Sequence, residues 1–485
     1  MKKIIETYKK NNSDFLFYDY ETFGTHTSLD RPAQFASIRT DQNLNIIEEP
    51  QCFYCFPSDD YLPDPNAVLI TGITPQYTEK YGSNEYKFAK KIHNILITPN
   101  TCIVGYNNII FDDEITRNIF YRNFFDPYEW SWKNNNSRWD LLNIVRACHA
   151  LRPDGIKWPK NEFGVPIFKL SELTKINHIL HNNVHDATSD VYATIKIAKL
   201  IKKKHPKLFN FFYKHRKKDI LYKSVKIESF KPVIYISSYF GAIRNNSSCI
   251  LPITWDLNNK NVLIAIDLFK DVKKLIAFLK KKPLSNIFFE NIFDLGVILV
   301  HLNRCPILAP IQSLRIKDIK RLNFDIDLYK NRVNLIKENL FLIRKVNKLL
   351  FRRNSYSVSS NVDLQLYNSF FNIHDKKLVN LINQTKPHHL KNIQPNFYDI
   401  RLNCLFFRYK ARNFFDVLNK NEKKIWLEYC LNIFNASYLR KYFYDIKILL
   451  NKHSNDIKNI NLLYDLLKYL CKKYKSLFHK KNKLI

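Results

Sequence analysis

The chain has 485 residues, 46% hydrophobic and 14% aromatic, which is enough apolar material for several cores and excludes a mostly disordered protein. No run approaches the ~20 apolar residues of a membrane span, and the N-terminal segment lacks the apolar part of a secretory signal, so a cytoplasmic protein is expected. The formal net charge of +33 favours a polyanionic partner, although an AT-rich genome would also raise the lysine content.

Alternating strands and helices are predicted over residues 1–204. The strands are expected at residues 14–24, 33–41, 51–57 and 101–108. The helices are expected at residues 85–97, 111–124, 138–151, 170–177 and 186–204, the last with Asp186 as its N-cap. This order predicts an α/β fold with a mixed sheet.

Residues 205–358 show short β-rich runs broken by Pro, Asn, Ser and Gly, which predicts a small β domain with helical insertions. Residues 361–485 show helical periodicity and are predicted to form a helical C-terminal domain. The polar segment at 352–361 is the candidate linker between them.

The nine cysteines are scattered along a chain without an export signal, which indicates reduced thiols. Cys52 and Cys55 have the spacing of half a zinc site, but no second pair stands nearby and a strand would direct their sulfur atoms to opposite faces. A structural role is expected for both.

Two carboxylates, Asp19 and Glu21, stand one residue apart in the apolar stretch FLFYDYETFG. Residues i and i+2 of a strand share a face, so the two like charges would lie side by side near a core. Such a pair is unfavourable unless a cation lies between the carboxylates, and a metal ion is the obvious candidate.

Further metal ligands are predicted at the starts of two helices. Asp112 and Asp113 begin the helix that follows the strand at 101–108, while His185 lies just before the helix that contains Asp190. Four carboxylates and a histidine fit two-metal phosphodiester hydrolysis, because oxygen ligands suit Mg²⁺ or Mn²⁺ and a neutral imidazole can take a proton from water. Each residue alone has a commoner structural explanation, and only their order and placement make the pattern specific.

With these motifs, the sequence resembles the DEDDh 3′-to-5′ exonucleases of the RNase H-like fold, and in particular the bacterial exodeoxyribonuclease I family. The strings DYETFGTHTSLDRPAQFASIRTD, GYNNIIFDDEITRNIFYRNFFDPYEWSW, SSYFGAIRNN and NVDLQLYNSFF carry the resemblance, which extends over nearly the whole chain. It implies an exonuclease module (1–204), an SH3-like domain with helical insertions (205–358) and a helical domain (361–485) that together form a clamp over single-stranded DNA. The implied activity is processive 3′-to-5′ degradation to 5′-mononucleotides with two Mg²⁺ ions, for which Mn²⁺ can substitute.

The resemblance also implies roles for individual residues. Asp19, Glu21 and Asp190 match the metal ligands, Asp112 matches the remaining carboxylate and His185 matches the general base. Asp113 is expected to be a helix N-terminal neighbour, with a share in the chemistry left open. The predicted substrate contacts are Glu21, Arg117, Tyr128, Trp132, Arg146, Lys169 and Arg244.

Several of these substrate contacts have alternatives. Lys169 stands where the family commonly has arginine, so the charge is kept and the bidentate fork is lost. Tyr128 and Trp132 are expected to contact bases or sugars, although aromatic residues there could equally belong to the core. Arg152 is a candidate for a basic pocket that binds the acidic, hydrophobic tail of single-stranded DNA-binding protein.

Two rival functions remain at this point. One is an exoribonuclease of the same superfamily, and the other is a single-stranded DNA-binding protein on a catalytically decayed scaffold. All five catalytic residue types are present, which argues against decay. The protein is expected to be a monomer.

Overall fold

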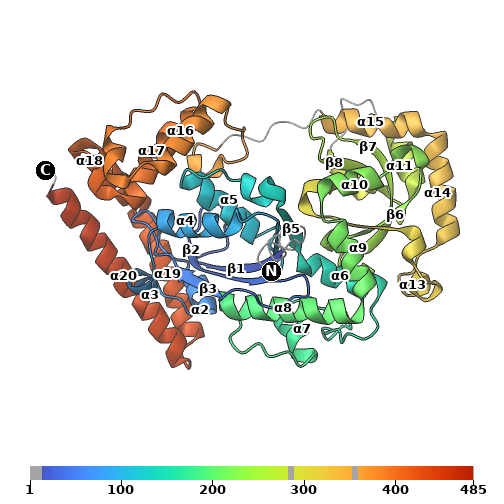
Figure 1. Cartoon of the computed structure of the whole chain (residues 1–485), viewed down its shortest axis with the longest axis horizontal. Coiled ribbons are helices and arrows are strands. Elements are labelled where there is room, and N and C mark those ends of the chain that lie inside the picture. The colour runs from blue at the N-terminus through green and yellow to red at the C-terminus, as the bar shows by residue number, and fades with distance from the viewer. Residues whose placement is uncertain (1–13, 282–288, 352–358, 484–485) are drawn as a thin grey trace, which may run out of the picture.

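The computed structural model describes residues 14–281, 289–351 and 359–483 (Figure 1). Within these ranges no helix is both long enough and apolar enough to cross a membrane. The N-terminal third contains a five-stranded mixed sheet in the order β3-β2-β1-β4-β5. The strands are β1 (Asp14–Thr22), β2 (Pro32–Thr40), β3 (Gln51–Tyr54), β4 (Thr101–Gly105) and β5 (Ser137–Asp140).

The central strand β1 pairs antiparallel with β2 and parallel with β4, as the mixed-sheet prediction requires. Strand β5 was not predicted, because its last three residues were assigned to the start of a helix. It pairs parallel with β4, and the helix begins only at Leu141. A short strand containing a buried arginine has no apolar alternation, and Arg138 is tolerated there because it forms an ion pair with Asp113.

Helices cover both faces of this sheet. On one face, Phe15 and Phe17 pack with residues of three helices within 141–214, while on the other Leu16, Tyr18 and Tyr20 pack with residues of two helices within 85–122. The helices of this part are α2 (Pro65–Thr71), α3 (Pro75–Tyr81), α4 (Glu85–Leu96), α5 (Asp112–Arg122), α6 (Leu141–Leu151), α7 (Leu170–Ile176), α8 (Ala187–Lys204), α9 (Pro206–Lys214) and α10 (Lys218–Ser224). The side chain of Asp186 accepts a hydrogen bond from the Ser189 amide, which confirms the predicted N-cap of α8.

A second, fully antiparallel sheet in the order β10-β6-β7-β8-β9 forms the middle of the chain (right in Figure 1). Its strands are β6 (Val233–Ile236), β7 (Ser247–Trp255), β8 (Val262–Asp267), β9 (Val297–His301) and β10 (Ile307–Pro310). The accompanying helices are α11 (Val272–Lys281), α12 (Phe289–Asp294), α13 (Ile316–Arg321), α14 (Ile326–Glu338) and α15 (Leu340–Phe351). One hydrophobic cluster runs from the first sheet into this one, so the two units share packing.

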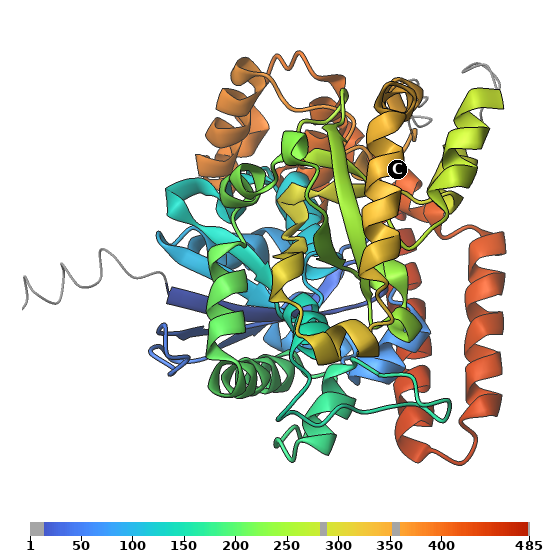
Figure 2. The ribbon, with the colours of Figure 1, turned by 90° about the vertical axis from the view of Figure 1, so that its right-hand side faces the viewer.

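The C-terminal part is helical, as predicted. It comprises α16 (Ile373–Gln384), α17 (Ile400–Asn413), α18 (Lys420–Ile433), α19 (Ala436–Lys452) and α20 (Ile457–Asn482). Figures 1 and 2 show these helices on the opposite side of the first sheet from the β-rich unit. Most of the candidate linker, residues 352–358, lies outside the described residues.

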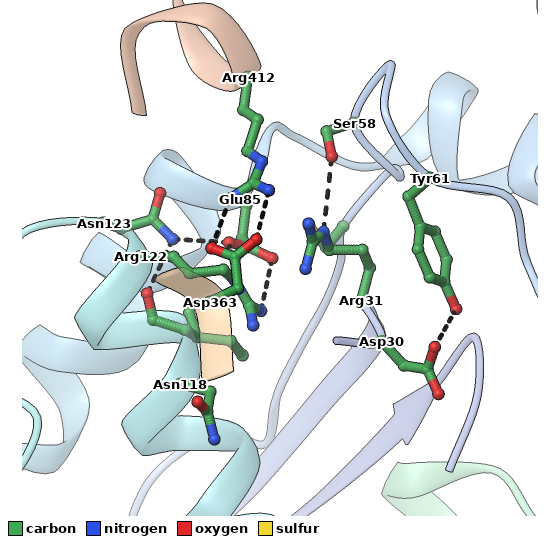
Figure 3. A network of polar contacts seen from close by, with 12 residues as sticks. Asp30, Arg31, Ser58, Tyr61, Glu85, Asn118, Arg122, Asn123, Asp363 and Arg412 are labelled. Carbon is green, nitrogen blue, oxygen red and sulfur yellow. Dashed lines mark hydrogen bonds and ion pairs between the residues drawn. The ribbon is translucent and has the colours of Figure 1, made fainter. Parts of the chain in front are cut away.

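A buried ionic network joins the C-terminal helices to the first unit (Figure 3). Arg412 of α17 donates hydrogen bonds to Asp60 at 2.8 Å and to Asp363 at 2.6 Å. Near it, Arg122 of α5 forms a bidentate pair with Glu85 of α4, with both distances 3.0 Å. Although burial pushes the pKa of Asp60 and Asp363 upward, the charge of Arg412 holds both pKa values well below their ordinary range.

The nine cysteines are free, which agrees with the expectation of reduced thiols. Cys55 is buried and Cys52 is exposed, and neither joins a metal-binding group among the residues that the structure describes.

Candidate active site

The carboxylates Asp19 and Glu21 lie near the end of β1, on the face that continues from Phe15 and Phe17. Glu21 is only 8% exposed. The pairing of β1 with β2 shifts register between Glu21 and Thr22, so the ladder becomes irregular directly after the second carboxylate. A strand buried along most of its length therefore fixes the backbone of both acids.

Asp112 is the first residue of α5, which follows β4 at the same edge of the sheet because β1 and β4 are parallel. Its Oδ1 accepts a hydrogen bond of 3.1 Å from the backbone amide of Tyr20, the residue between the two strand carboxylates. The predicted carboxylate is thus held directly against the strand.

Asp113 serves a different purpose. Its carboxylate accepts hydrogen bonds from the Tyr18 hydroxyl at 2.5 Å and from Asn108 Nδ2 at 3.1 Å, and it is paired with Arg138. The side chain is fully buried. Because these donors occupy its oxygens, the open possibility that Asp113 shares the chemistry is not supported.

The start of α8 contributes the remaining two residues. His185 lies just before the helix in a left-handed backbone conformation (φ +66°), and Asp190 lies in its first turn. One ligand atom each of Glu21, His185 and Asp190 lies within 4.8 Å of the others. The structure therefore brings together side chains that are separated by about 165 residues in the sequence.

Gln34, which the sequence analysis did not consider, joins the two elements that bear these residues. It lies opposite Glu21 in the β1–β2 ladder and is fully buried. Its Nε2 donates to Asp186 Oδ2 at 3.0 Å, and its Oε1 accepts from the Ala187 amide at 3.1 Å. The start of α8 is thereby attached to the sheet beside Glu21.

A second histidine, His181, was also missed. Its Nε2 lies 2.5 Å from Asp190 Oδ1 and its Nδ1 lies 3.2 Å from the Thr174 hydroxyl of α7. The stretch HNNVHD contains both histidines, so the presence of two candidates was visible in the sequence. Their contacts were not, because they depend on how the loop before α8 folds.

The electrostatics of the cluster fit a divalent cation. Burial, followed by the neighbouring carboxylates, raises the pKa of Glu21 to about 8 and that of Asp112 to about 8. The same causes raise the pKa of Asp19, and burial raises that of Asp190 despite its hydrogen bond with His181. No ion pair with lysine or arginine is found for these four acids within the described ranges, so hard oxygen donors lie together with only the His181 ring bonded to one of them.

A cavity of about 650 Å³ opens beside this cluster. Arg146 and Lys169, two of the predicted substrate contacts, line it together with His181, His185 and Asp190. The Nε of Arg146 is buried without a hydrogen-bond partner in the described structure. The β-rich unit also reaches the cavity through Ala242 and Asn246.

A second cavity of about 490 Å³ contains Arg117, Tyr128 and Trp132 in its lining. Trp132 is 61% exposed, which is more consistent with a contact surface than with a core position. The guanidinium of Arg117 is less available for a substrate contact, because it pairs with Glu114 at 2.5 Å and donates to the Tyr367 hydroxyl at 3.2 Å. Tyr128 is partly buried, and its ring lies 5.4 Å from that of Phe370.

The remaining two predicted contacts lie in the β-rich unit and at its border. Arg244 forms an ion pair with Asp267 at 3.2 Å and lines neither of the two cavities. Arg152 directly follows α6, donates to the Ser313 carbonyl at 2.9 Å and lies 3.4 Å from Asp318. The roles proposed for both residues stay predictions.

The mixed sheet, with carboxylates gathered at the end of its central strand, is that of a metal-dependent exonuclease. Family models agree with this class along the chain. The model described as exonuclease matches residues 16–198, the exonuclease I SH3-like domain matches 216–353, and the exonuclease I C-terminal domain matches 360–473.

Known proteins are similar over almost the full length. Exodeoxyribonuclease I of Buchnera aphidicola subsp. Schizaphis graminum is 65% identical over 480 residues, which cover 99% of each chain. The Escherichia coli exodeoxyribonuclease I is 46% identical over 466 residues, covering 95% of this chain and 98% of that one. This chain belongs to the exodeoxyribonuclease I family.

Solved structures of exonuclease I are similar as well. The E. coli enzyme in complex with a dA16 oligonucleotide superposes with a TM-score of 0.90 at 44% identity, covering 95% of this chain and all of the other. A zinc-bound complex with single-stranded DNA has a TM-score of 0.88 at 43% identity, covering 95% of this chain and 100% of the other. A structure described as SSB/exonuclease I has the same score and identity, covering 96% of this chain and 100% of the other. The predicted fold class is confirmed.

Proposed function

We propose that this exonuclease degrades single-stranded DNA processively from its 3′ end and releases 5′-mononucleotides, with two Mg²⁺ ions that Mn²⁺ can replace. The observation that carries the proposal is the convergence of Glu21, His185 and Asp190 within 4.8 Å, beside the raised-pKa carboxylates Asp19 and Asp112. The relatives named exodeoxyribonuclease I and the E. coli complex with dA16 support DNA as the substrate.

Asp19, Glu21 and Asp190 would hold the metal ions, and Asp112 completes the acidic site. When bound, such ions supply charge stabilisation at the attacking and leaving oxygens of the phosphodiester. Tyr20 fixes Asp112 through its backbone amide, and His181 fixes Asp190 through its ring. These contacts keep the carboxylates in place without a change in conformation.

His185 takes the proton of the attacking water in this proposal. Its side chain is exposed on the loop before α8, so water and substrate can reach the ring. Arg146 and Lys169 bind phosphate oxygens in the same cavity, while Trp132 and Tyr128 offer aromatic faces to the bases in the second cavity. The units on either side of the first sheet support a clamp that retains the strand between cleavage steps (Figure 1).

The decisive experiment compares the wild type with Asp19→Ala on a 5′-labelled DNA strand and on the matched RNA strand, with Mg²⁺ or Mn²⁺. The wild type is expected to release mononucleotides from DNA, and Asp19→Ala is expected to be slower by roughly 10³-fold, because a lost metal ligand removes several kcal/mol of stabilisation. Asp327→Ala, at an exposed surface pair with Lys330, is the matched control and should keep full activity.

Each rival function gives a different result in this assay. Preference for RNA would identify an exoribonuclease. Tight binding of DNA with equal, negligible rates for the wild type and Asp19→Ala would identify a decayed binding protein.

A second proposal concerns a protein partner. Four cations, Arg152, Arg315, Lys317 and Arg321, surround only two carboxylates, Asp154 and Asp318. This excess of positive charge fits the acidic tail of single-stranded DNA-binding protein, in agreement with the SSB/exonuclease I structure of the relative. The proposed complex contains one copy of this chain.

The test measures binding of a labelled tail peptide by fluorescence anisotropy. Arg152→Ala is expected to weaken binding by about tenfold, as for the loss of one charge-assisted contact. Lys330→Ala, a lysine paired with Asp327 on an exposed helix surface, is the control. Equal affinity of the wild type and Arg152→Ala would place the partner elsewhere.

A further inference from the structure

One turn of the β-rich unit reaches into the cavity that contains the catalytic carboxylates. The turn runs from Ser237 to Asn246 between β6 and β7, and Ala242 and Asn246 line the cavity beside Arg146 and Lys169. The wall of the active site is therefore built by two structural units. A side chain on this turn can act on substrate bound at the exonuclease site.

Asn246 is the notable residue of this turn. It is only 3% exposed, and its Nδ2 is buried without any hydrogen-bond partner in the described part of the chain. Its backbone groups are both in use, since its amide donates to the Gly241 carbonyl at 2.9 Å and its carbonyl accepts from Ser237 at 2.8 Å. Buried amide donors are rarely left unpaired because the loss of water is then uncompensated.

A purely conformational explanation accounts for part of this arrangement. Asn245 and Asn246 both have left-handed backbones, with φ of +52° and +51°, and asparagine tolerates this region better than most residues. Conformation explains why asparagine is suited to both positions. It does not explain why the Asn246 side chain, unlike that of Asn245, lines the cavity with a buried donor that has no partner in the described part of the chain.

We infer that Asn246 donates a hydrogen bond from Nδ2 to a non-bridging oxygen of a phosphodiester in the bound strand. The inference rests on the proposed function, since it requires a nucleic acid in this cavity. Phosphate is favoured over a base because Arg146 and Lys169 bring two cations to the same cavity, so the anionic part of the strand is drawn there. The β-rich unit then takes part directly in substrate binding at the catalytic centre.

The test uses equilibrium binding of a 5′-labelled single strand in EDTA, where no cleavage interferes. Asn246→Gly removes the amide but keeps a residue suited to the left-handed backbone, and Asn245→Gly is the matched control at the neighbouring position. Asn246→Gly is expected to bind about 10-fold more weakly, and Asn246→Asp still more weakly because it adds a negative charge. Asn245→Gly is expected to bind like the wild type.

Strands with a single methylphosphonate at successive linkages locate the contact. Wild type should lose affinity at each contacted linkage, whereas Asn246→Gly should be insensitive at one of them. Wild-type affinity in Asn246→Gly, an equal loss in Asn245→Gly, a uniform loss at all linkages, or a loss that depends only on base identity would each overturn the inference. If the wild type binds in this pattern but releases no mononucleotides, the proposed function fails and the Asn246 contact stands.

Discussion

Buried carboxylates occur in two regions of this chain, and their surroundings are opposite. In the network between the first unit and the C-terminal helices, Asp60, Asp363 and Glu85 each lie against arginine side chains that hold their pKa values below the ordinary range (Figure 3). At the end of β1, Glu21 and Asp112 lie against other acids, and their pKa values are raised to about 8.

The difference separates two uses of buried charge. The charge of a carboxylate that is paired with arginine is compensated within the protein, and the pair stabilises one arrangement of domains. A group of carboxylates without arginine partners is unfavourable until a cation from solution compensates their negative charge. Such a group is therefore suited to bind a cation and its substrate. The predictions below test this contrast.

The largest effect on stability is expected for Asp363→Asn. The change leaves the Arg412 charge only partly compensated in a buried site, where Arg412 is 5% exposed, and should lower the free energy of unfolding by roughly 3 to 5 kcal/mol. Chemical denaturation measures this loss. Asp59→Asn is the control, because its pair with Lys480 is partly exposed and should contribute less than about 1 kcal/mol. Equal losses in both variants would contradict the contrast.

An intermediate effect is expected for Glu21→Gln without metal ions. This change should raise the free energy of unfolding, whereas Asp363→Asn lowers it. Because the pKa of Glu21 rises from 4.5 to about 8 on folding, the native state holds a proton that the unfolded chain has lost. Stability should therefore fall as the pH rises between these values, because the unfolded chain releases a proton that the folded state retains, by at most about 1.4 kcal/mol per pH unit for one site.

Melting temperatures in EDTA from pH 5 to pH 8 measure this dependence. Glu21→Gln should reduce the slope without removing it, since Asp112 titrates in the same range. Asp363→Asn should leave the slope unchanged, because the depressed pKa of Asp363 keeps it ionised throughout, and its contribution is lost only at acidic pH. If Glu21→Gln does not alter the pH dependence of the melting temperature, the pKa of Glu21 is not raised in the folded protein.

The smallest effect is expected for Lys169→Arg. In the ionic network Arg122 forms a bidentate pair with Glu85, whereas the cavity is lined by a lysine, Lys169, which has no such fork. A guanidinium should bind phosphate two- to fivefold more tightly, a gain of about 0.5 to 1 kcal/mol, measured as single-strand affinity in EDTA. Weaker binding by the arginine variant would indicate that the cavity is shaped for the smaller ammonium group.

Much of the candidate site was predictable because local patterns carry it. The strand with Asp19 and Glu21, the helix start at Asp112 and the N-cap at Asp186 all appear where the sequence places them. Strand β5 was missed because four residues, two of them charged, carry no apolar periodicity. The contacts of His181 were missed because they depend on how the loop before α8 folds, whereas the contact of Gln34 and the position of Asn246 in the cavity join elements far apart in the chain.

No local sequence pattern predicts the ionic network. Arg412 is 352 residues from Asp60 and 49 from Asp363, so only the assembled fold shows that these charges meet. In the same way, the pairing of Arg244 with Asp267 depends on how β7 and β8 align.

The position of Arg412 near the end of the chain has a consequence for synthesis on the ribosome. Asp60 is translated early, but its closest cation arrives only with α17, and until then it has Arg31 at 3.7 Å. Until α17 is made, the Asp60 carboxylate therefore has only part of the positive charge that surrounds it in the complete fold. A chain released before that point lacks the ion pair that joins Asp60 to the C-terminal helices.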